Sequence, residues 1–214
     1  MENIMISIKN LCKSFGSEQV LFDISHEFEK GKIHGIVGNN GSGKSVFFKC
    51  VCGFLFTEQG EIYFDGKRVG KEIDFPDSLG IIIETPGFLP GASGFKNLKM
   101  LAALKGRASD DKIRETITKV GLDPNMKKHV GKYSLGMRQR LGIAQAIMED
   151  PQCLILDEPF NGLDKEGVAA MRDLIKGLRE EGKTILLASH NATDIEALCD
   201  TVCEMDAGVM TIIS

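Results

Sequence analysis

The sequence lacks any apolar stretch near the roughly 20 residues that a helix needs to cross a bilayer, so no transmembrane span is predicted. It also lacks a large excess of either charge, because 26 Lys and Arg face 30 Asp and Glu, a net charge of −4. That balance argues against a general nucleic-acid binder and against a polybasic membrane anchor, although a small basic patch is compatible with it.

Internal repeats, low-complexity segments and obvious linkers are absent as well. A chain of 214 residues without them is expected to form one large domain or a domain plus a subdomain. None of the six cysteines belongs to a Cys-x-x-Cys pair, and most stand in apolar runs, which favours reduced core thiols over metal ligands or disulfides. The first ten residues alternate polar and apolar, which is typical of a strand and not of a signal peptide, so a cytoplasmic location is expected.

Short apolar runs alternate with longer helical patterns along the chain. Strands are predicted at residues 4–8, 20–28, 32–37, 61–64, 79–83, 153–156 and 184–188. Helices are predicted at about 44–54, within 93–148, and over a segment that carries Val168 to Leu178 and is capped by Asp164. This alternation predicts an α/β fold with a largely parallel sheet, into which a contiguous helical block is inserted.

A glycine-rich loop follows the third predicted strand. The segment matches the pattern G-x-x-x-x-G-K-[ST] and comprises Gly38, Asn39, Asn40, Gly41, Ser42, Gly43, Lys44 and Ser45, with Val46 next to it. Glycines allow backbone N–H groups to close around an anion, and the start of a helix adds its positive dipole end. We therefore predict a phosphate-binding loop in which Lys44 reaches the β- and γ-phosphates and the Ser45 hydroxyl binds Mg²⁺.

Two carboxylates follow the apolar run 153–156. Asp157 and Glu158 are therefore predicted at the carboxyl end of a buried strand, where α/β folds bind ligands. Asp157 suits the Mg²⁺ shell, and Glu158 suits activation of an attacking water as a base or a positioning group. Alone this pattern is weak, but it is strong when it lies downstream of a phosphate loop.

Further motifs resemble those of ATP-binding cassette (ABC) transporter ATPases. The segment 133–137, just before 138–141 and about 20 residues ahead of Asp157, is similar to the family's signature sequence. Other motifs of the family follow in its order: Phe15 resembles the aromatic residue that stacks on adenine, Glu84 stands where the Q-loop glutamine usually does, 161–164 resembles the D-loop, and His190 resembles the switch histidine.

The resemblance implies an α/β P-loop NTPase of the ABC type with a small antiparallel β subdomain and an inserted α-helical subdomain. Residues 1–214 would form one ATPase domain, with a core at about 1–90 and 150–214 and a helical subdomain and signature helix at about 91–149. It implies an ATP-hydrolysing subunit whose cofactors are ATP and Mg²⁺. Glu158 and His190 would be catalytic; Ser45, Asp157 and Glu84 would hold the metal; and Phe15, Ser134, Gly136 and Asp164 would contact nucleotide.

The same resemblance implies two protein partners, while the acidic net charge argues against a nucleic-acid partner. A second ATP-binding subunit, expected to be another copy of this chain, would face the first so that each signature meets the other's γ-phosphate. A separate integral membrane subunit would carry the substrate and dock on the helical block and on residues 84–94. The chain would then lie on the inner face of the membrane and drive export of a peptide, antibiotic or lipid-like substrate.

Two departures from the usual family pattern indicate which branch of the family this chain resembles most. The usual signature reads Leu-Ser-Gly-Gly-Gln, whereas this chain keeps Ser134 and Gly136 but has Tyr133, Leu135 and Met137. The Q-loop residue is the acid Glu84. Both departures resemble the bacitracin and lantibiotic resistance branch, whose chains often extend further at the C-terminus, so a bare cassette without an accessory domain is expected here.

The residues leave alternatives open. Ser134 can be a plain helix N-cap, Phe15 an ordinary packing residue, Glu84 an exposed acid and His190 a structural histidine. His26, His34 and His129 belong to no motif and are expected to be structural or exposed. At the level of function, the alternative is a soluble ABC ATPase that acts on DNA or ribosomes. A GTPase is disfavoured because no Asn-Lys-x-Asp motif occurs.

Overall fold

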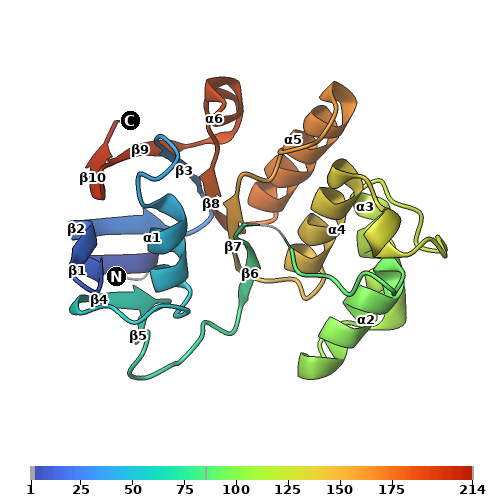
Figure 1. Ribbon diagram of the computed structural model, residues 1–214, viewed down its shortest axis with the longest axis horizontal. Helices are drawn as coiled ribbons and strands as arrows, with labels where there is room; N and C mark the ends of the chain where they lie inside the picture. Colours follow the sequence, from blue (N-terminus) through green and yellow to red (C-terminus); the bar gives the residue numbers. More distant parts are fainter. Residues whose placement is uncertain (1–2, 85, 214) are drawn as a thin grey trace.

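The computed structural model describes residues 3–84 and 86–213 (Figure 1). Its elements in chain order are β1 (Ile4–Phe15), β2 (Glu18–Glu29), β3 (Ile33–Val37), α1 (Lys44–Val51), β4 (Gln59–Phe64), β5 (Lys67–Arg68), β6 (Leu79–Ile82), α2 (Gly94–Lys105), α3 (Asp110–Lys119), the 3₁₀ helix η1 (Val130–Lys132), α4 (Leu135–Ile147), β7 (Cys153–Asp157), α5 (Lys165–Glu180), β8 (Thr184–Ala188), α6 (Ala192–Leu198), β9 (Thr201–Asp206) and β10 (Val209–Ile212). Within these described ranges, no helix has both the length and the apolar character needed to cross a membrane.

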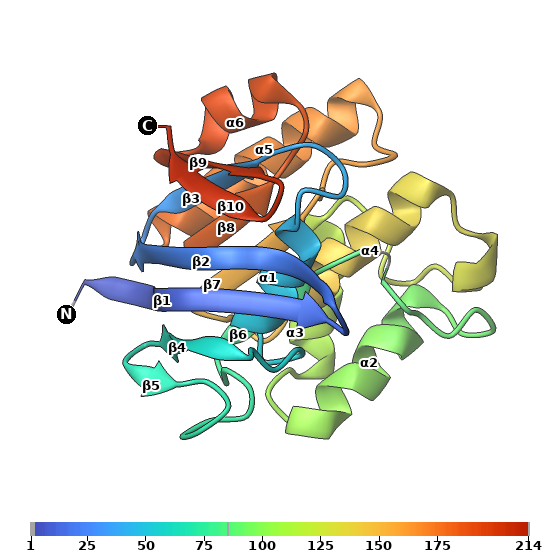
Figure 2. The ribbon, with the colours of Figure 1, turned by 60° about the vertical axis from the view of Figure 1, so that its left-hand side comes forward.

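The strands form two sheets. An antiparallel sheet has the order β2-β1-β4-β5, and its long strands β1 and β2 lie in front in Figure 2. The second sheet has the order β10-β9-β3-β8-β7-β6, and all its neighbouring pairs are parallel except β10 with β9. The α/β class and the largely parallel sheet predicted from the sequence are confirmed.

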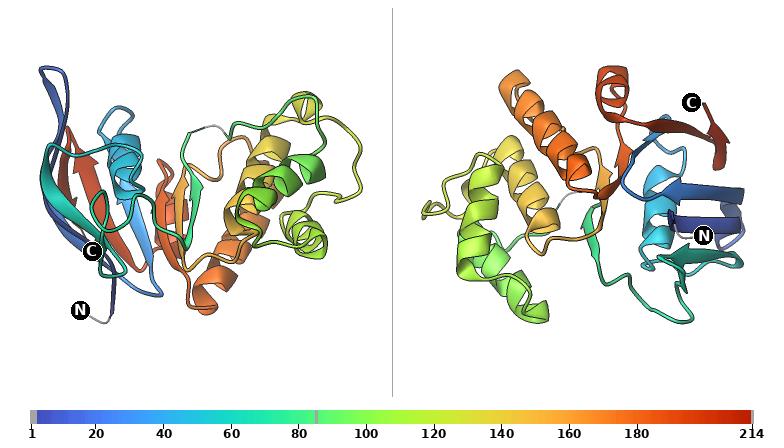
Figure 3. Two further views of the ribbon diagram at one scale, coloured as in Figure 1. Left: turned by 90° about the horizontal axis from the view of Figure 1, so that it is seen from below. Right: turned by 180° about the vertical axis from the view of Figure 1, so that it is seen from behind.

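Both faces of the parallel sheet are buried, one under helices and the other under α1 and the antiparallel sheet, and successive side chains of each strand point to opposite faces. In β7, Leu154 and Leu156 join a core with the helices α2 to α5, whereas Cys153 and Ile155 join a core with α1 and the antiparallel sheet. The left view of Figure 3 shows these layers in order, with the antiparallel sheet at one side and helices α2 to α4 at the other. This two-faced burial explains why 153–156 reads as a continuous apolar run.

Most predicted elements lie where the sequence places them, with differences at their ends. The helix predicted at 44–54 ends at Val51, because Gly53 takes a left-handed conformation and the Phe54 N–H donates to Lys49 O at 2.8 Å, which closes the helix with a Schellman motif. The helical pattern at 93–148 contains three separate α-helices. The sequence pattern does not predict α6, β9 and β10. Residues 1 and 2, which belong to the alternating first ten residues, lie outside the described residues.

Four of the six cysteines are buried, in agreement with the predicted core thiols: Cys50, Cys52, Cys153 and Cys203. Burial raises the pKa of the Cys50 and Cys52 thiols to about 12. These thiols therefore stay neutral at physiological pH and pack as small apolar groups.

Two hairpins of the same geometry differ in how well their sequences suit the turn. The β4–β5 turn has Asp65 and Gly66 at φ of 46° and 78°, and the β9–β10 turn has Ala207 and Gly208 at 45° and 81°. Positive φ at both central positions defines a type I′ turn, in which Asn-Gly and Asp-Gly are preferred. Ala207 therefore adopts a conformation that an L-alanine disfavours.

Replacing Ala207 with Asn is expected to raise the free energy of unfolding by about 0.5–1 kcal/mol, because asparagine tolerates the left-handed conformation. Urea denaturation followed by circular dichroism measures this as a higher midpoint at an unchanged slope. Ala207→Val is the matched control and should be destabilised, since a β-branched residue resists positive φ. Equal midpoints for the Asn and Val variants would show that the turn geometry is not as described.

Candidate functional site

The carboxyl ends of three neighbouring parallel strands meet at one edge of the sheet. Ile36 of β3 pairs with Ala188 of β8, which in turn pairs with Asp157 of β7. Consequently, the segments that follow these strands are brought together, although the first is more than 100 residues from the other two in sequence. They are the glycine-rich loop, the pair Asp157 and Glu158, and the segment that holds His190.

The glycine-rich loop leads from β3 directly into α1, as predicted. At Gly38 a Cβ atom would lie 2.1 Å from the Met205 carbonyl oxygen, so only glycine fits between the loop and β9. The Gly208 N–H of the β9–β10 turn donates to Ser42 O at 3.0 Å. Lys44 is buried, and its ammonium donates to the carbonyls of Gly38 at 2.7 Å and Asn39 at 2.9 Å.

Ser42 carries an unsatisfied polar atom within this loop. Its side chain is 5% exposed, and among the described residues its hydroxyl is a buried polar side-chain group without a hydrogen-bond partner. Buried hydroxyl groups are nearly always hydrogen-bonded, because leaving one unpaired costs about 1–3 kcal/mol. An anion held by the loop would supply the missing acceptor, so the loop fits a bound phosphate.

Ser45 and Asp157 form the second part of the site. The Ser45 hydroxyl donates to Asp157 Oδ2 at 2.6 Å. Burial raises the pKa of the Asp157 carboxyl, while the hydrogen bond from Ser45 and the charge of Lys44 act in the opposite direction. A hydroxyl and a buried carboxylate are oxygen ligands of the kind that Mg²⁺ prefers, and a cation would compensate for the burial of the charge.

Glu158 and His190 form the third part. His190 Nδ1 lies 2.8 Å from Glu158 Oε2. Glu158 has a φ of 53°, an uncommon conformation that costs about 1–3 kcal/mol outside glycine. Its N–H donates to Ala188 O at 3.0 Å, and the buried Gln139 amide donates to its carbonyl at 3.2 Å. The backbone around Glu158 is thereby held in the conformation that directs its carboxylate toward His190.

A cavity of about 480 Å³ joins the phosphate loop to these carboxylates. Its walls come from the loop and α1, from Glu84 and Pro86, from the first turns of α4, and from Asp157, Glu158 and Asn161. The α4 side chains are Leu135, Arg138 and Gln139. The cavity thus brings together Lys44, Ser45 and Glu84 with Asp157 and Glu158, whereas Gly38, Asn39, Ser42 and His190 are not among its lining residues.

Glu84 lines this cavity but has a partner of its own. Its carboxylate lies 2.6 Å from the Lys49 ammonium of α1, and its φ is 61°. The side chain is 62% exposed, so it is free to exchange one partner for another. Lys49, 35 residues away, is a contact that the sequence motifs do not indicate.

Four other predicted site residues do not line this cavity: Phe15, Ser134, Gly136 and Asp164. Phe15 is half-exposed, with the Lys13 ammonium 5.1 Å from its ring centre. The Ser134 hydroxyl accepts from Met137 N at 3.2 Å and caps α4. The Asp164 carboxylate accepts from Gly167 N at 2.8 Å and caps α5. Gly136 lies against the D-loop, since a Cβ there would be 2.7 Å from Gly162 O.

The helix-cap interpretation of Ser134 and the predicted cap at Asp164 are therefore confirmed. Gln139 and Arg138 contribute to the cavity without having been singled out by sequence. Their only signal in the sequence was their place in the helix that follows the signature-like segment.

The histidines outside the motifs have structural or surface positions, as predicted. His129 is exposed and His26 is partly buried. His34 is buried, and its ring nitrogens lie 2.9 Å from Glu29 O and 2.7 Å from the Thr201 hydroxyl.

Known proteins resemble this chain along nearly all its length. Residues 21–161 match the family model described as "ABC transporter". An uncharacterised ABC transporter ATP-binding protein of Bacillus subtilis, YybJ, is 44% identical over 95% of this chain and 94% of its own. The bacitracin transport ATP-binding protein BcrA of Enterococcus faecalis is 39% identical over 95% of this chain and 67% of its own. The lantibiotic transport ATP-binding protein SrtF of Streptococcus pyogenes is 37% identical over 92% of this chain and 85% of its own length.

Solved structures agree with these relatives. An ATP-binding subunit of an ABC transporter superimposes with a TM-score of 0.86 at 25% identity, covering 98% of this chain and 90% of that one. A dimeric ATP-binding cassette bound to ADP and Pi superimposes with a TM-score of 0.87 at 21% identity, covering 98% and 99%. The fold implied by the sequence motifs is confirmed.

Proposed function

This chain belongs to the ABC transporter family, and we propose that it powers export of a peptide, antibiotic or lipid-like substrate through a separate membrane subunit. It is an ATP-binding and ATP-hydrolysing subunit. The substrate class rests on BcrA and SrtF, which are named as bacitracin and lantibiotic transport proteins. The observation that carries the proposal is the meeting of the phosphate loop with Asp157, Glu158 and His190 at one sheet edge.

The geometry supports a specific division of roles in ATP hydrolysis. Lys44, now bonded to Gly38 O and Asn39 O, would exchange these carbonyls for phosphate oxygens. Glu158 would accept a proton from the attacking water or orient it. His190, 2.8 Å from that carboxylate, would hold it in place and meet the γ-phosphate. Phe15, exposed and unattached to the main core, would pack on adenine.

Magnesium fits the donor set formed by Ser45, Asp157 and Glu84. When bound, Mg²⁺ would neutralise the phosphate charge that builds up during transfer. Ser45 and Asp157 already touch each other, so little rearrangement is needed on their side. Glu84 would exchange its ion pair with Lys49 for the metal ion. Because Glu84 begins the segment 84–94, this change of partner would couple the nucleotide site to that segment.

Replacing Glu84 with Gln tests this coupling. Because a neutral amide is a weaker ligand for a hard cation, the Mg²⁺ concentration at half-maximal ATPase activity should rise by about three- to tenfold. Transport measured with the membrane partner present should fall more than hydrolysis does. Glu181→Gln, at an exposed acid beyond α5, is the matched control. Wild-type Mg²⁺ dependence together with wild-type transport would remove Glu84 from the metal site and from coupling.

The proposed functional unit is a pair of these chains. The family resemblance of the signature segment supports this pairing; Ser134 and Gly136 do not line the cavity of their own chain, although Leu135 between them does. In the pair, each signature segment would approach the other chain's phosphate loop, and ATP between them would hold the two together. Asp164 would lie at the same contact.

The membrane subunit would place this chain on the inner face of the cell membrane. Exposed apolar side chains support a docking surface near the helices and the loop 84–94: Leu89 is 55% exposed, Met100 47% and Leu104 81%. Isolated surface leucines are common, but Met100 and Leu104 are four residues apart and therefore lie on one face of α2, where a partner can cover both. Thr85 within the loop lies outside the described residues.

Reconstitution tests the transport proposal directly. The chain should co-purify with an integral membrane protein from detergent-solubilised membranes of its own cells. In proteoliposomes that complex should move a candidate peptide outward only when ATP is hydrolysed. If no membrane protein co-purifies with the chain and ribosomes or DNA do, the transport proposal is overturned and the soluble ABC ATPase is favoured.

A further inference from the structure

Charge is divided unevenly along the chain despite its balanced total. Residues 91–149 contain twelve Lys and Arg but only five Asp and Glu, whereas the remaining residues contain fourteen and twenty-five. The segment 91–149 is thus basic while the rest of the molecule is acidic, and within it α2 and α4 have no acidic residues whereas α3 has equal numbers of basic and acidic ones. A local positive field of this kind attracts anions, whatever the net charge of the whole chain.

A second cavity lies within this basic region. It has a volume of about 480 Å³ and is bordered by the start of α2, by α3 and by the segment that joins α3 to η1. The lining side chains that matter here are Phe95, Lys96, Arg114, Met126, Lys127 and His129. Every charged or titratable side chain around it is basic, and no carboxylate borders it among the described residues.

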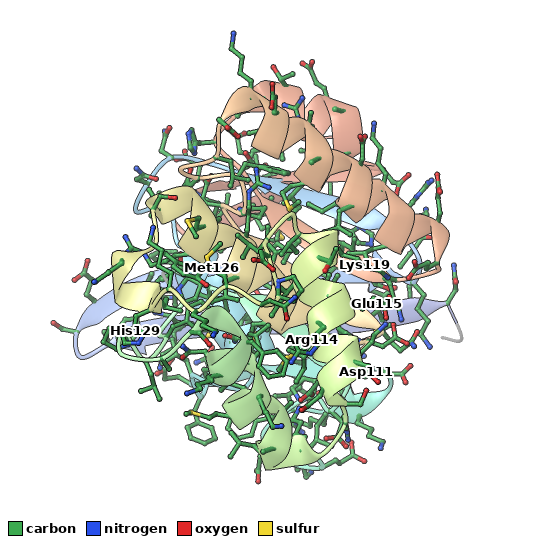
Figure 4. The ribbon with its side chains drawn as sticks, turned by 90° about the vertical axis from the view of Figure 1, so that its right-hand side faces the viewer. Asp111, Arg114, Glu115, Lys119, Met126 and His129 are labelled. Carbon is green, nitrogen blue, oxygen red and sulfur yellow. The ribbon has the colours of Figure 1, made fainter. Side chains whose placement is uncertain are left out.

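Figure 4 faces this side of the molecule. Arg114 projects from α3, and Met126 and His129 come from the segment that follows it. The acids of α3, Asp111 and Glu115, lie toward the opposite flank of that helix in this view. In this view Asp111 and Glu115 are thus set apart from Met126 and His129, and neither acid lines the cavity.

The cations that line the cavity lack carboxylate partners, unlike their neighbours. Lys96, Arg114 and Lys127 make no ion pair with any described residue. Just outside the cavity, in contrast, Lys99 lies 2.6 Å from Asp110 and Lys119 lies 3.1 Å from Glu115. No described carboxylate therefore pairs with these three cations, although the Asp123 carboxylate accepts from the Asn125 N–H at 2.9 Å beside the cavity.

Arg114 is nevertheless fixed in position by neutral groups. Its guanidinium donates to Asn125 Oδ1 at 2.9 Å and lies 4.3 Å from the centre of the Phe95 ring. Neither contact neutralises its charge, and stacking on an aromatic face orders the planar guanidinium. An ordered arginine with donors left over is a preorganised anion ligand.

We propose that this cavity binds a phosphate group, carried either by a soluble compound or by a lipid headgroup. A phosphate carries up to two negative charges and three acceptor oxygens, which match several converging cations better than a single carboxylate does. The cavity shares no lining residue with the cavity around the phosphate loop. The site is therefore distinct from the ATP site, whereas its lining residues 91–93 belong to the segment 84–94 proposed above to dock on the membrane subunit.

Methyl NMR gives a local readout, because Met126 lines the cavity and is partly buried. The chain is labelled with [¹³C-methyl]methionine, Met126 is assigned through Met126→Leu, and the ATP site is filled with ADP. Inorganic phosphate is then titrated at constant ionic strength. We expect a saturable shift of the Met126 resonance.

Two adjacent lysines supply a matched pair of variants. Lys127 lines the cavity and Lys128 does not, although both are exposed and without an ion pair among the described residues. Lys127→Glu should weaken phosphate binding by about tenfold or more, whereas Lys128→Glu should change it less than about twofold, although both remove the same net charge. Circular dichroism confirms that each variant is folded.

A second arm separates the possible sources of the phosphate. Co-sedimentation is measured with vesicles of phosphatidylglycerol and phosphatidylcholine and with vesicles of phosphatidylcholine alone. Binding to the anionic vesicles that depends on Lys127 but not on Lys128 supports the proposal and identifies a lipid headgroup; the same dependence with free phosphate alone identifies a soluble ligand. No saturable shift with either probe, or equal effects of the two variants, would overturn the site.

Discussion

Glu158→Gln is expected to lower the rate of ATP hydrolysis by about 10²–10⁴-fold, the usual contribution of a positioned general base. The amide keeps the shape of the side chain but has no carboxylate to accept a proton from water. Neither the phosphate loop nor the Ser45–Asp157 contact involves the Glu158 side chain. ATP binding should therefore persist while turnover is lost.

Phosphate release at saturating ATP and Mg²⁺ measures this loss, and nucleotide affinity is measured separately by calorimetry. Glu180→Gln, an exposed acid at the end of α5, is the matched control and should retain full activity. Turnover near the wild-type rate in Glu158→Gln would mean that another group activates the water. His190, in contact with Glu158, would then be the first residue to examine.

Lys44→Ala is expected to weaken ATP binding by about 100-fold, because a hydrogen bond to a charged group contributes roughly 1.5–3 kcal/mol. The buried ammonium is the cation held within the loop, and its two carbonyl partners there are backbone groups that tolerate its loss. The loop would keep its N–H groups and helix start but lose the charge that offsets the triphosphate.

Calorimetric titration with ATP and circular dichroism, performed on the same sample, separate loss of binding from loss of folding. Lys176→Ala, on the exposed side of α5, changes the net charge equally and should leave affinity unchanged. A folded Lys44→Ala chain with wild-type affinity for ATP would disprove the phosphate-loop assignment.

Local motifs were sufficient to predict the parts of the site that are contiguous in sequence. The loop 38–45, the strand that ends at Asp157 and the caps at Ser134 and Asp164 each depend on spacing over a few residues, and the sequence displays that spacing. Their convergence depends on strand order, which the α/β pattern and the family motifs together indicate. The α/β class followed from the alternation of elements alone.

Contacts between distant segments could not be predicted in the same way. The ion pair of Glu84 with Lys49 joins a loop to a helix face, and no local pattern encodes it. The hairpin of β9 and β10 was missed because its turn has Ala207 in place of a typical Asn or Asp. The basic cavity could not be predicted from the net charge of −4. The excess of acidic residues outside 91–149 cancels the excess of basic residues within that segment when charges are summed over the chain.

The central claim is that ATP joins two copies of this chain into the unit that hydrolyses it. Light scattering coupled to size exclusion measures it most directly, with Glu158→Gln to prevent turnover. With ATP and Mg²⁺ the mass should be twice the 23.4 kDa of one chain, and with ADP it should return to that of a single chain. A mass of one chain with ATP fully bound would contradict the account.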